Sequence, residues 1–352
     1  MSCNRCSELP KIDFEKCKVY LKVPTKHHLK PVRNLIERLG IKYYFGKNYF
    51  LFKVNSFKKF ILKLDKLKLN ILDKKDIKIL PMNVNDGLTF ESLENIRSLQ
   101  TWINFYKSED VLDVLRYGKI KVLFQPIIDL KNKDVYGYEA LSRGLTNDGK
   151  EINPGRLFKK AKQLDLVFFL DRLCRESIIK QADKLNLKKK LFINFLPTSI
   201  YDPKKCLKST DQAVKKTKLD PKQITFEVVE TEYIEDFDHL NYILDYYREK
   251  GYSTALDDIG SGYANKRSLI SLTPDYMKID MGIIQGVSKD IEKQKRLKEY
   301  LKLANDKNIK TLAEGIETKE DLKYVIDSNI DLAQGYFFSK PHKDLKSLDL
   351  KK

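Results

Sequence analysis

Residues 224–259 read ITFEVVETEYIEDFDHLNYILDYYREKGYSTALDDI, and this stretch decides the fold class. It opens and closes on short runs rich in β-branched and apolar residues, ITFEVVE and STALDDI, which predict strands. Between them, EDFDHLNYILDYYREKG carries apolar residues at the spacing of a helix. A strand, a helix and a second strand in this order predict two parallel strands joined by a helical crossover.

The same alternation of strand-like and helical stretches continues from about residue 120 onward. The strand-like runs are KVLFQPIIDL, VYGYEAL, LFINFLP, ITFEVVE, STALDDI, YMKID, KTLAEGIE and LAQGYFF. Eight such runs in about 230 residues match the size of a (β/α) barrel with parallel strands. A doubly wound open sheet is the alternative fold.

A smaller unit precedes this region. Residues 18–81 contain strand-like and helical stretches in the order β-α-β-β-α-β, which is that of a ferredoxin-like domain. The residues that follow look mostly helical, with Thr89 as a candidate N-cap. We therefore expect a tail over 1–17, a small sensory or regulatory domain over 18–82, a helical linker over 83–118 and a barrel domain over 119–345.

Composition excludes several classes of protein. The chain has 352 residues, of which 42% are hydrophobic and 33% charged, so it is neither disordered nor collagen-like. Its apolar runs are shorter than the ~18 residues of a membrane helix, and its first residues lack the apolar core of a signal peptide. We expect a cytoplasmic protein with no membrane association.

The net charge of +18 comes from lysine, because the 67 basic residues comprise 55 lysines and 12 arginines. Proteins that read nucleic acids usually favour arginine, whose planar fork matches phosphates and base edges. The lysines are also dispersed along the chain. We therefore interpret them mainly as a solvated surface and expect nucleic acid to be an unlikely partner.

The five cysteines do not form a disulfide framework, because Cys17, Cys174 and Cys206 are widely scattered. Cys3 and Cys6 form a C-x-x-C pair without a second pair at the spacing of a zinc site. Two free thiols in the tail are the favoured interpretation, and metal binding or redox sensing stays open.

Polar residues stand where the strand-like runs end, one for nearly every strand–helix unit. In a barrel such strand ends converge on the carboxyl face, where active sites lie. Helix caps explain single cases but not the whole series. The residues are Glu139, Asn194, Glu227, Asp257, Asp258, Lys278, Glu314 and Gln334.

The chemistry of this set points to divalent cations. Carboxylate and amide oxygens without histidine suit Mg²⁺ or Mn²⁺ and not Zn²⁺. Carboxylates gathered this closely repel one another unless cations are present. The Asp257–Asp258 pair suggests two ions, an arrangement that supports phosphodiester hydrolysis. Lys278 could orient the attacking water or neutralise charge, and a structural salt bridge with Asp280 is the alternative.

YEALSR at residues 138–143 resembles the name-giving signature of EAL domains, the cyclic di-GMP phosphodiesterases. The resemblance covers about residues 105–343 and rests on an ordered set of motifs. The others are FQPI at 124–127, FINFLP at 192–197, EVVE at 227–230, DDIGSGY at 257–263, KID at 278–280, AEGIET at 313–318 and QGYFFSKP at 334–341.

The resemblance implies a function for each matching residue, along with hydrolysis of cyclic di-GMP to linear pGpG by two Mg²⁺ or Mn²⁺ ions. The implied metal ligands are Glu139, Asn194, Glu227, Asp257, Asp258 and Glu314. The implied catalytic residues are Lys278, Glu139 and Gln334, and the implied substrate contacts are Gln125, Leu141, Arg143, Asn194 and Gln334. Glu230 is the implied loop anchor, with Asp280 and Glu317 in support.

The resemblance also implies a modified TIM barrel with one strand reversed, and a homodimer formed through this domain. Two positions depart from the family pattern: Ile259 replaces the usual Phe and Val229 the frequent Thr. The first puts the coupling between site and dimer in doubt, but the predicted ligands are all present. A receptor that binds cyclic di-GMP without hydrolysing it is the alternative function.

Overall fold

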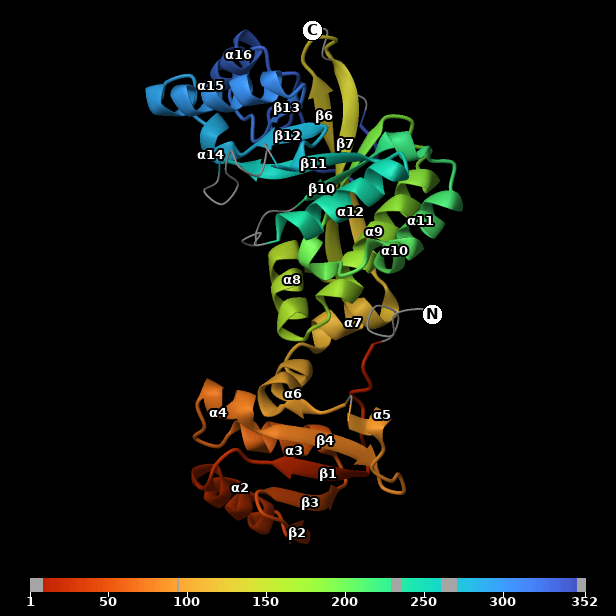
Figure 1. Ribbon diagram of the computed structural model, residues 1–352, viewed down its shortest axis with the longest axis vertical. Helices are drawn as coiled ribbons and strands as arrows, with labels where there is room; N and C mark the ends of the chain where they lie inside the picture. The colour runs from red at the N-terminus through yellow and green to blue at the C-terminus, as the bar shows by residue number, and fades with distance from the viewer. Residues whose placement is uncertain (1–8, 94, 229–235, 261–270, 347–352) are drawn as a thin grey trace. The chain divides into compact units, whose positions relative to one another are not determined.

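The computed structural model describes residues 9–93, 95–228, 236–260 and 271–346, and these residues form two compact units (Figure 1). The N-terminal unit contains residues 9–118 together with Thr146–Val167. The barrel unit contains Lys119–Leu145 and the described residues from Phe168 onward. The segment Thr146–Val167 thus groups with the N-terminal unit although it lies within the barrel sequence.

The N-terminal unit has the predicted ferredoxin-like arrangement. Its strands are β1 (Cys17–Lys22), β2 (Tyr43–Phe45), β3 (Tyr49–Val54), β4 (Lys78–Asn83) and β5 (Arg97–Ser98). They form one antiparallel sheet in the order β2-β3-β1-β4-β5. The short edge strand β5 was not predicted from the sequence, since two residues carry no periodicity.

Helices complete this unit, and its segment Thr146–Val167 also contains the short strand β8 (Glu151–Ile152), which belongs to the nine-stranded sheet and not to the five-stranded one. The helices are α2 (Lys26–Arg38), α3 (Phe57–Asp65), α4 (Ile71–Asp76), α5 (Phe90–Leu93), α6 (Leu99–Tyr106), α7 (Glu109–Tyr117) and α8 (Pro154–Gln163). Helix α3 is amphipathic, with Phe60 and Leu64 buried one turn apart. Thr89 accepts a hydrogen bond from the backbone of Ser92, as expected of an N-cap of α5.

Eight strands of the described chain close a barrel. They are β6 (Ile120–Asp129), β7 (Asp134–Leu145), β9 (Lys190–Phe195), β10 (Ile224–Val228), β11 (Ser253–Ile259), β12 (Tyr276–Ile279), β13 (Lys310–Ala313) and β14 (Leu332–Ala333). Neighbouring strands from β7 through β9 to β14 run parallel. The barrel closes because β6 pairs with both β14 and β7.

Both pairings of β6 are antiparallel, so the all-parallel barrel suggested by strand–helix alternation is wrong for this strand. The reversal that the family resemblance implies is confirmed. Its local cause is the short connection to β7, in which Asp129 accepts hydrogen bonds from the backbone of Lys131 and Asn132. Four residues make a hairpin turn and cannot form the helical crossover that parallel strands need.

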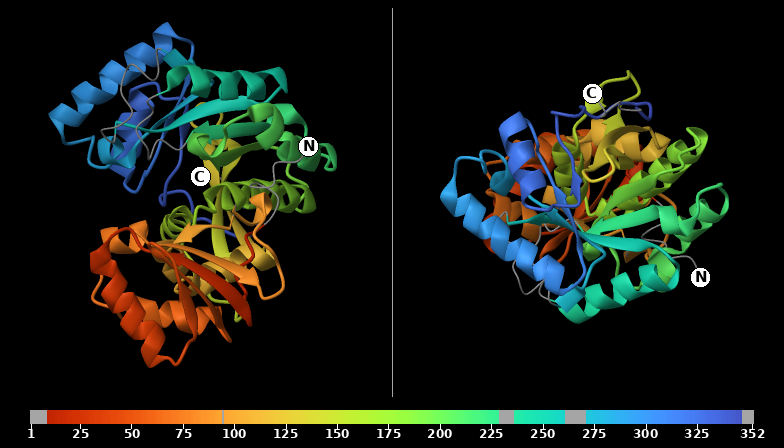
Figure 2. Two further views of the ribbon diagram at one scale, coloured as in Figure 1. Left: turned by 60° about the horizontal axis from the view of Figure 1, so that its bottom comes forward. Right: turned by 90° about the horizontal axis from the view of Figure 1, so that it is seen from above.

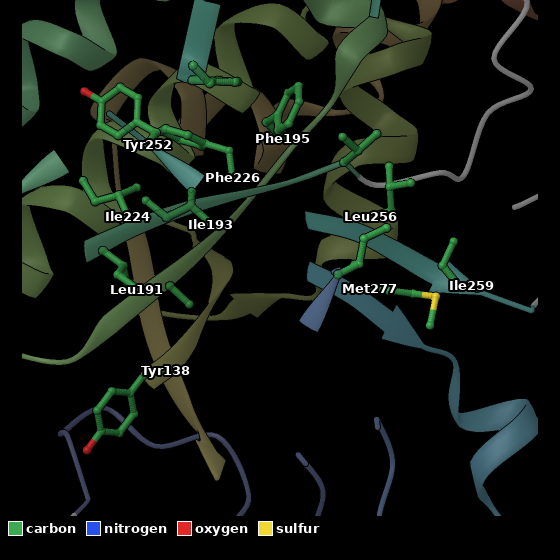
Figure 3. Packing of buried hydrophobic residues seen from close by; sticks show 14 of the residues in the cluster. Tyr138, Leu191, Ile193, Phe195, Ile224, Phe226, Tyr252, Leu256, Ile259 and Met277 are labelled. Carbon is green, nitrogen blue, oxygen red and sulfur yellow. The ribbon is translucent and has the colours of Figure 1, made fainter. Parts of the chain in front are cut away.

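Helices surround the barrel strands (Figure 2, right). They are α9 (Val167–Lys184), α10 (Pro203–Cys206), α11 (Lys208–Lys215), α12 (Phe237–Glu249), α14 (Met281–Ile284), α15 (Ile291–Asp306) and α16 (Lys319–Asp327), with 3₁₀ turns η1 (Pro197–Ser199) and η2 (Pro221–Gln223). Outward-facing strand residues pack against the helices in one core (Figure 3). There the rings of Phe226 and Tyr247 stack with centroids 4.0 Å apart.

A second apolar layer fills the inside of the barrel. It is a small cluster, separate from the outer core, to which six strands contribute one buried residue each. Its members are Ile127, Phe192, Ala255, Tyr276, Leu312 and Leu332. This layer closes the barrel interior below the carboxyl ends of the parallel strands. Polar residues two positions further along these strands therefore lie above an apolar floor.

Candidate active site

The polar residues at the strand ends occupy the layer directly above this floor. Side chains two residues apart on a strand point to the same face, so Asn194 follows Phe192 and Glu314 follows Leu312 on the inner face. On β6, which runs the other way, the order is inverted and Gln125 precedes Ile127. The two-residue period therefore brings residues far apart in the chain into one layer.

Lys278 lies among the carboxylates of this layer. Its Nζ atom is 2.9 Å from oxygens of both Asp257 and Glu314. It is 3.0 Å from Glu227 and 3.6 Å from Glu139. Lys278 and Glu227 are fully buried, so these charges interact with little screening by water. We call the five acidic residues here the carboxylate cluster: Glu139, Glu227, Asp257, Asp258 and Glu314.

Glu139 is held by two side-chain amides as well as by Lys278. Asn194 Nδ2 donates to its Oε1 at 3.1 Å, and Gln334 Nε2 donates to its Oε2 at 2.7 Å. Burial raises the pKa of Glu139, but the charge of Lys278 and these hydrogen bonds outweigh it and leave the pKa below its ordinary value. Glu139 is therefore the member of the cluster that stays ionised most readily.

The other carboxylates have the opposite tendency. Burial raises the pKa of Glu227 and Glu314 well above their ordinary values, and repulsion from neighbouring carboxylates adds to the effect. The pKa of Asp257 is raised by the same causes. Burial lowers the pKa of Lys278, yet the surrounding carboxylates outweigh it and hold that pKa well above its ordinary value. One lysine therefore does not keep all of these carboxylates ionised.

Asp258, next to the last residue of β11, has an unusual backbone conformation. Its φ of 55° lies in the left-handed region, which non-glycine residues rarely adopt. Its backbone N–H donates to Asp257 Oδ1 at 3.0 Å, and the pairing of β11 with β12 shifts register between Leu256 and Ile259. Burial and the neighbouring Asp257 raise the pKa of Asp258 to about 6. This local irregularity allows two consecutive aspartates to serve one site.

The donor set fits divalent cations. Carboxylate oxygens of Asp257, Asp258 and Glu314 lie within 4.8 Å of one another, close enough to share an ion. Asn194 Oδ1 and Glu227 Oε2 are buried and accept no hydrogen bond from any described residue. Buried oxygens without a donor are costly, and a hard cation satisfies them.

Of the remaining predicted residues, Gln125 lies on β6, and Leu141 and Arg143 lie on β7. Gln125 is buried and donates to the backbone of Ser339. Arg143 is half-buried and donates to the backbone of Ser142, while Leu141 is also half-buried. Glu317 is exposed.

Asp280 does not pair with Lys278, whose ion pairs in the described chain are those to the cluster. It accepts a hydrogen bond from Gly282 N at the start of α14. Ile259 is fully buried in the outer core. Val229, Glu230 and the pair Cys3 and Cys6 lie outside the described residues.

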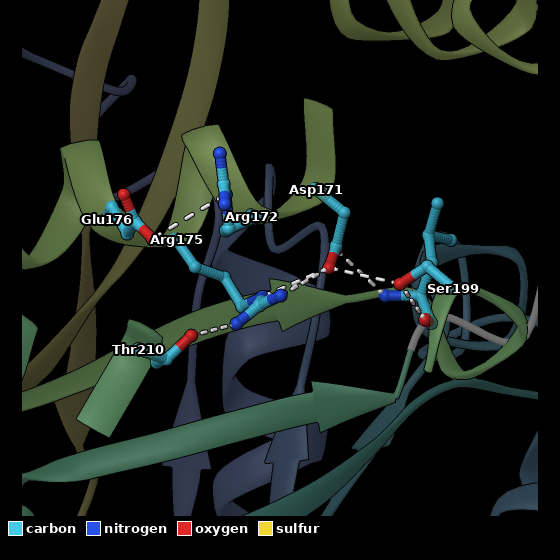
Figure 4. Close-up of polar contacts among 7 residues, drawn as sticks. Asp171, Arg172, Arg175, Glu176, Ser199 and Thr210 are labelled. Carbon is cyan, nitrogen blue, oxygen red and sulfur yellow. Dashed lines mark hydrogen bonds and ion pairs between the residues drawn. The ribbon is translucent and has the colours of Figure 1, made fainter. Parts of the chain in front are cut away.

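One buried polar network near the site was not predicted from the sequence. Asp171 on α9 accepts hydrogen bonds from Leu196 N and Ser199 Oγ, both at 3.1 Å (Figure 4). Arg175, one turn along α9, pairs with Asp171 at 2.9 Å and donates to Thr210. Because Leu196 comes two residues after Asn194, this network fixes the end of the strand that bears Asn194. The available signal was a charged pair four residues apart within the apolar spacing of α9.

None of the helices in the described ranges is long and apolar enough to span a bilayer.

Comparison with known proteins places the barrel unit in a family. The family model described as "EAL domain" matches residues 108–341. A curated relative named "Probable cyclic di-GMP phosphodiesterase PdeG", from Escherichia coli, is 31% identical over 248 residues. That alignment covers 67% of this chain and 48% of the relative, so the chain spans about half the relative's length.

Solved structures agree with this match. A standalone versatile EAL protein from Vibrio cholerae, in its c-di-GMP bound form, is 36% identical with a TM-score of 0.61, covering 66% of this chain and 98% of its own. BlrP1 from Klebsiella pneumoniae, in a manganese/cy-diGMP complex, shares only the fold at 21% identity and a TM-score of 0.59. That likeness covers 95% of this chain and 98% of BlrP1, and so includes the N-terminal unit. The chain belongs to the EAL domain family.

Proposed function

We propose that this protein hydrolyses cyclic di-GMP to linear pGpG with the help of two divalent cations, Mg²⁺ or Mn²⁺. The observation that carries the proposal is the complete carboxylate cluster around Lys278, with buried acceptor oxygens that no described residue satisfies. The name of the Escherichia coli relative and the bound ligand of the Vibrio cholerae protein support the choice of substrate.

The residues proposed to hold the cations are those that offer oxygen at the strand ends: Glu139, Asn194, Glu227, Asp257, Asp258 and Glu314. When bound, two cations lower the pKa of water and offset negative charge on the leaving oxygen. Protons compete with cations for the raised-pKa carboxylates, and cation binding brings these groups back to their ionised form.

Lys278 places a positive charge among the proposed ligands. The carboxylates keep it protonated, and its Nζ is positioned by Asp257 and Glu314 at 2.9 Å. We propose that it orients the attacking water and offsets charge that develops on the phosphate. Because it is buried, its charge acts in an environment of low dielectric constant, where electrostatic stabilisation is strongest.

The amide side chains of Gln334 and Asn194 fix Glu139, and two further residues are proposed to contact the substrate. Gln334 and Asn194 hold both oxygens of Glu139 in one orientation, so it needs no rearrangement during the reaction. We assign Arg143, with Gln125, to substrate contact, since a guanidinium pairs well with phosphate oxygens.

The reaction consumes one water for each linear dinucleotide formed. The water oxygen adds to phosphorus and the P–O3′ bond breaks. The 3′ oxygen leaves with a proton, and the product keeps a 5′ phosphate.

We further propose that the protein is a homodimer formed through the barrel unit and that the N-terminal unit regulates turnover.

The direct test is to incubate the purified full chain with cyclic di-GMP and Mn²⁺ and to separate the products by chromatography. We expect pGpG with Mn²⁺ or Mg²⁺, none in excess chelator, and little with Ca²⁺, whose longer and looser ligand bonds misplace the reacting groups. The variant Glu139→Ala should bring turnover to background. Full activity in chelator would show that the cations are not needed, and tight binding without turnover would favour a receptor.

A further inference from the structure

The N-terminal unit contains a groove of about 930 Å³ beside its sheet. It lies where the edge strand β2 is too short to cover its neighbour, since β2 pairs only with Phe50–Phe52 of β3. Its walls are the segment from Leu39 to Lys42, the end of β3 and the first two turns of α3. The volume is within the range of small-molecule sites, about 300–1,000 Å³.

The groove is lined by like charge. None of the described residues around it is an aspartate or a glutamate. Five of them are lysines: Lys18, Lys42, Lys53, Lys59 and Lys63. We call this the lysine groove. Of the five, Lys18 donates to the backbone of Asp86, and the other four are exposed with no carboxylate partner among the described residues. Lysines elsewhere in the unit do pair, as Lys74 and Lys107 do with Asp65.

The placement of two of these lysines is unfavourable for the helix that carries them. Lys59 lies in the first turn of α3, where the helix dipole disfavours a cation, and this turn contains no acidic residue. Lys63 lies one turn further along the same face, at a spacing where like charges repel. An anion in the lysine groove would offset the repulsion between these two side chains.

An aromatic ring lies on the sheet face that carries Lys53, because Tyr44 pairs with Leu51 on β3. Tyr44 lines the lysine groove and is 61% exposed, with its ring tilted against that of Tyr49 at a centroid distance of 6.1 Å. The neighbouring Tyr43 donates its hydroxyl to Glu37, a carboxylate that is not part of the lining. Tyr44 thus offers an open flat surface for a ring of the ligand, such as a nucleobase.

We propose that the lysine groove binds a small polyphosphate, with the phosphate chain among Lys53, Lys59 and Lys63. The ligand is a nucleoside polyphosphate or an inorganic one, and Tyr44 distinguishes the two. This site is independent of the proposed hydrolysis in the barrel. A bounded groove in a single unit favours a small ligand over a nucleic-acid duplex, which needs an extended track of phosphate contacts.

The test is binding of ATP, GTP and inorganic tripolyphosphate to the full chain, measured by calorimetry in chelator so that barrel cations do not contribute. The variant Lys53→Ala/Lys59→Ala/Lys63→Ala should weaken binding about tenfold or more, since three charge contacts are lost. The control Lys47→Ala/Lys68→Ala/Lys75→Ala removes the same charge from exposed positions outside the groove and should leave affinity within about twofold.

Each outcome decides the proposal or its ligand. Tighter binding of the nucleotides, lost in Tyr44→Ala, identifies a nucleoside polyphosphate, and equal binding of tripolyphosphate identifies the phosphate chain alone. Equal weakening by both triple variants would overturn the site, because it would show attraction to net charge only. So would tighter binding of a 20-base-pair DNA duplex, or the absence of measurable binding by all three probes. None of these results depends on whether cyclic di-GMP is hydrolysed.

Discussion

The carboxylate cluster in the barrel and the lysine groove in the N-terminal unit are opposite in charge and in burial. The first gathers five acidic residues, four of which contact Lys278, and Lys278 and Glu227 are fully buried. The second gathers five lysines, four of them exposed, and the described residues that line it include no acid. Both concentrate like charge, which a folded chain tolerates only at a cost. The difference is that water screens the groove and leaves the cluster unscreened.

This difference sets the size of the effects expected in each region. Two unit charges 4 Å apart interact by about 4 kcal/mol at the effective dielectric constant of a protein site and about 1 kcal/mol in water. Changes in the carboxylate cluster should therefore alter both catalysis and stability strongly. Changes in the lysine groove should alter ligand affinity and leave the free energy of unfolding nearly unchanged.

The largest effect is expected at Lys278. The variant Lys278→Ala removes a cation that contacts four carboxylates. The kcat for cyclic di-GMP should fall by about three orders of magnitude, on the scale of a catalytic electrostatic group, while KM changes much less. Steady-state kinetics at saturating Mn²⁺ measures both, with Lys310→Ala at the opposite end of the barrel as a control. A variant that loses thermal stability but keeps its kcat would show a purely structural lysine.

A buried and an exposed ion pair provide the next comparison. Asp171→Asn leaves Arg175 buried without its counter-charge and should lower the free energy of unfolding by about 3 kcal/mol or more. Asp134→Asn breaks an exposed pair with Lys189 and should cost less than about 1 kcal/mol. Urea unfolding monitored by circular dichroism measures both values. Similar losses in the two variants would contradict the importance of burial.

We expect Asp171 also to position Asn194, because it holds the end of the strand that bears this residue. Asp171→Asn should therefore raise the Mn²⁺ concentration needed for half-maximal activity, measured well below the unfolding temperature. Asp134→Asn should not change it. An unchanged Mn²⁺ dependence in Asp171→Asn would limit this network to stability.

The smallest effect is a pH dependence of stability. Burial and Asp257 raise the pKa of Asp258 to about 6, so the folded state binds this proton more tightly than the unfolded chain does. The resulting stabilisation is complete below about pH 4 and is lost as the pH rises through 6. In chelator, raising the pH from 5 to 7 should therefore lower the Tm of the parent protein more, or raise it less, than that of Asp258→Asn. Identical pH responses in the two proteins would contradict the raised pKa.

The sequence predicts those features that repeat along the chain. Strand and helix periods predict the barrel and the ferredoxin-like order, and the two-residue strand period places Glu314 and Gln334 at one face. Strand periodicity does not show direction, so the reversal of β6 comes from the family resemblance and from the short hairpin after Asp129. The sequence could suggest Lys278 as a charge in the site. Its contacts with four separate strands depend on barrel closure.

Features that form between distant segments of the chain were not predicted from the sequence. The lysine groove joins a loop, a strand end and a helix start, and its lysines look like solvated surface when met one by one. Asp171 and Arg175 resemble an ordinary helical ion pair until the structure shows that both are 2% exposed. The grouping of Thr146–Val167 with the N-terminal unit depends on tertiary contacts alone.

We propose above that the carboxylate cluster and Lys278 direct water to a phosphodiester. The most direct measurement is the reaction of cyclic di-GMP with the full chain and Mn²⁺ in ¹⁸O-labelled water, followed by mass spectrometry of the product. We expect pGpG that carries one ¹⁸O atom in its 5′ phosphate, formed by the parent protein and reduced to background in Glu139→Ala. Unchanged cyclic di-GMP, or pGpG formed equally by Glu139→Ala, would contradict the account.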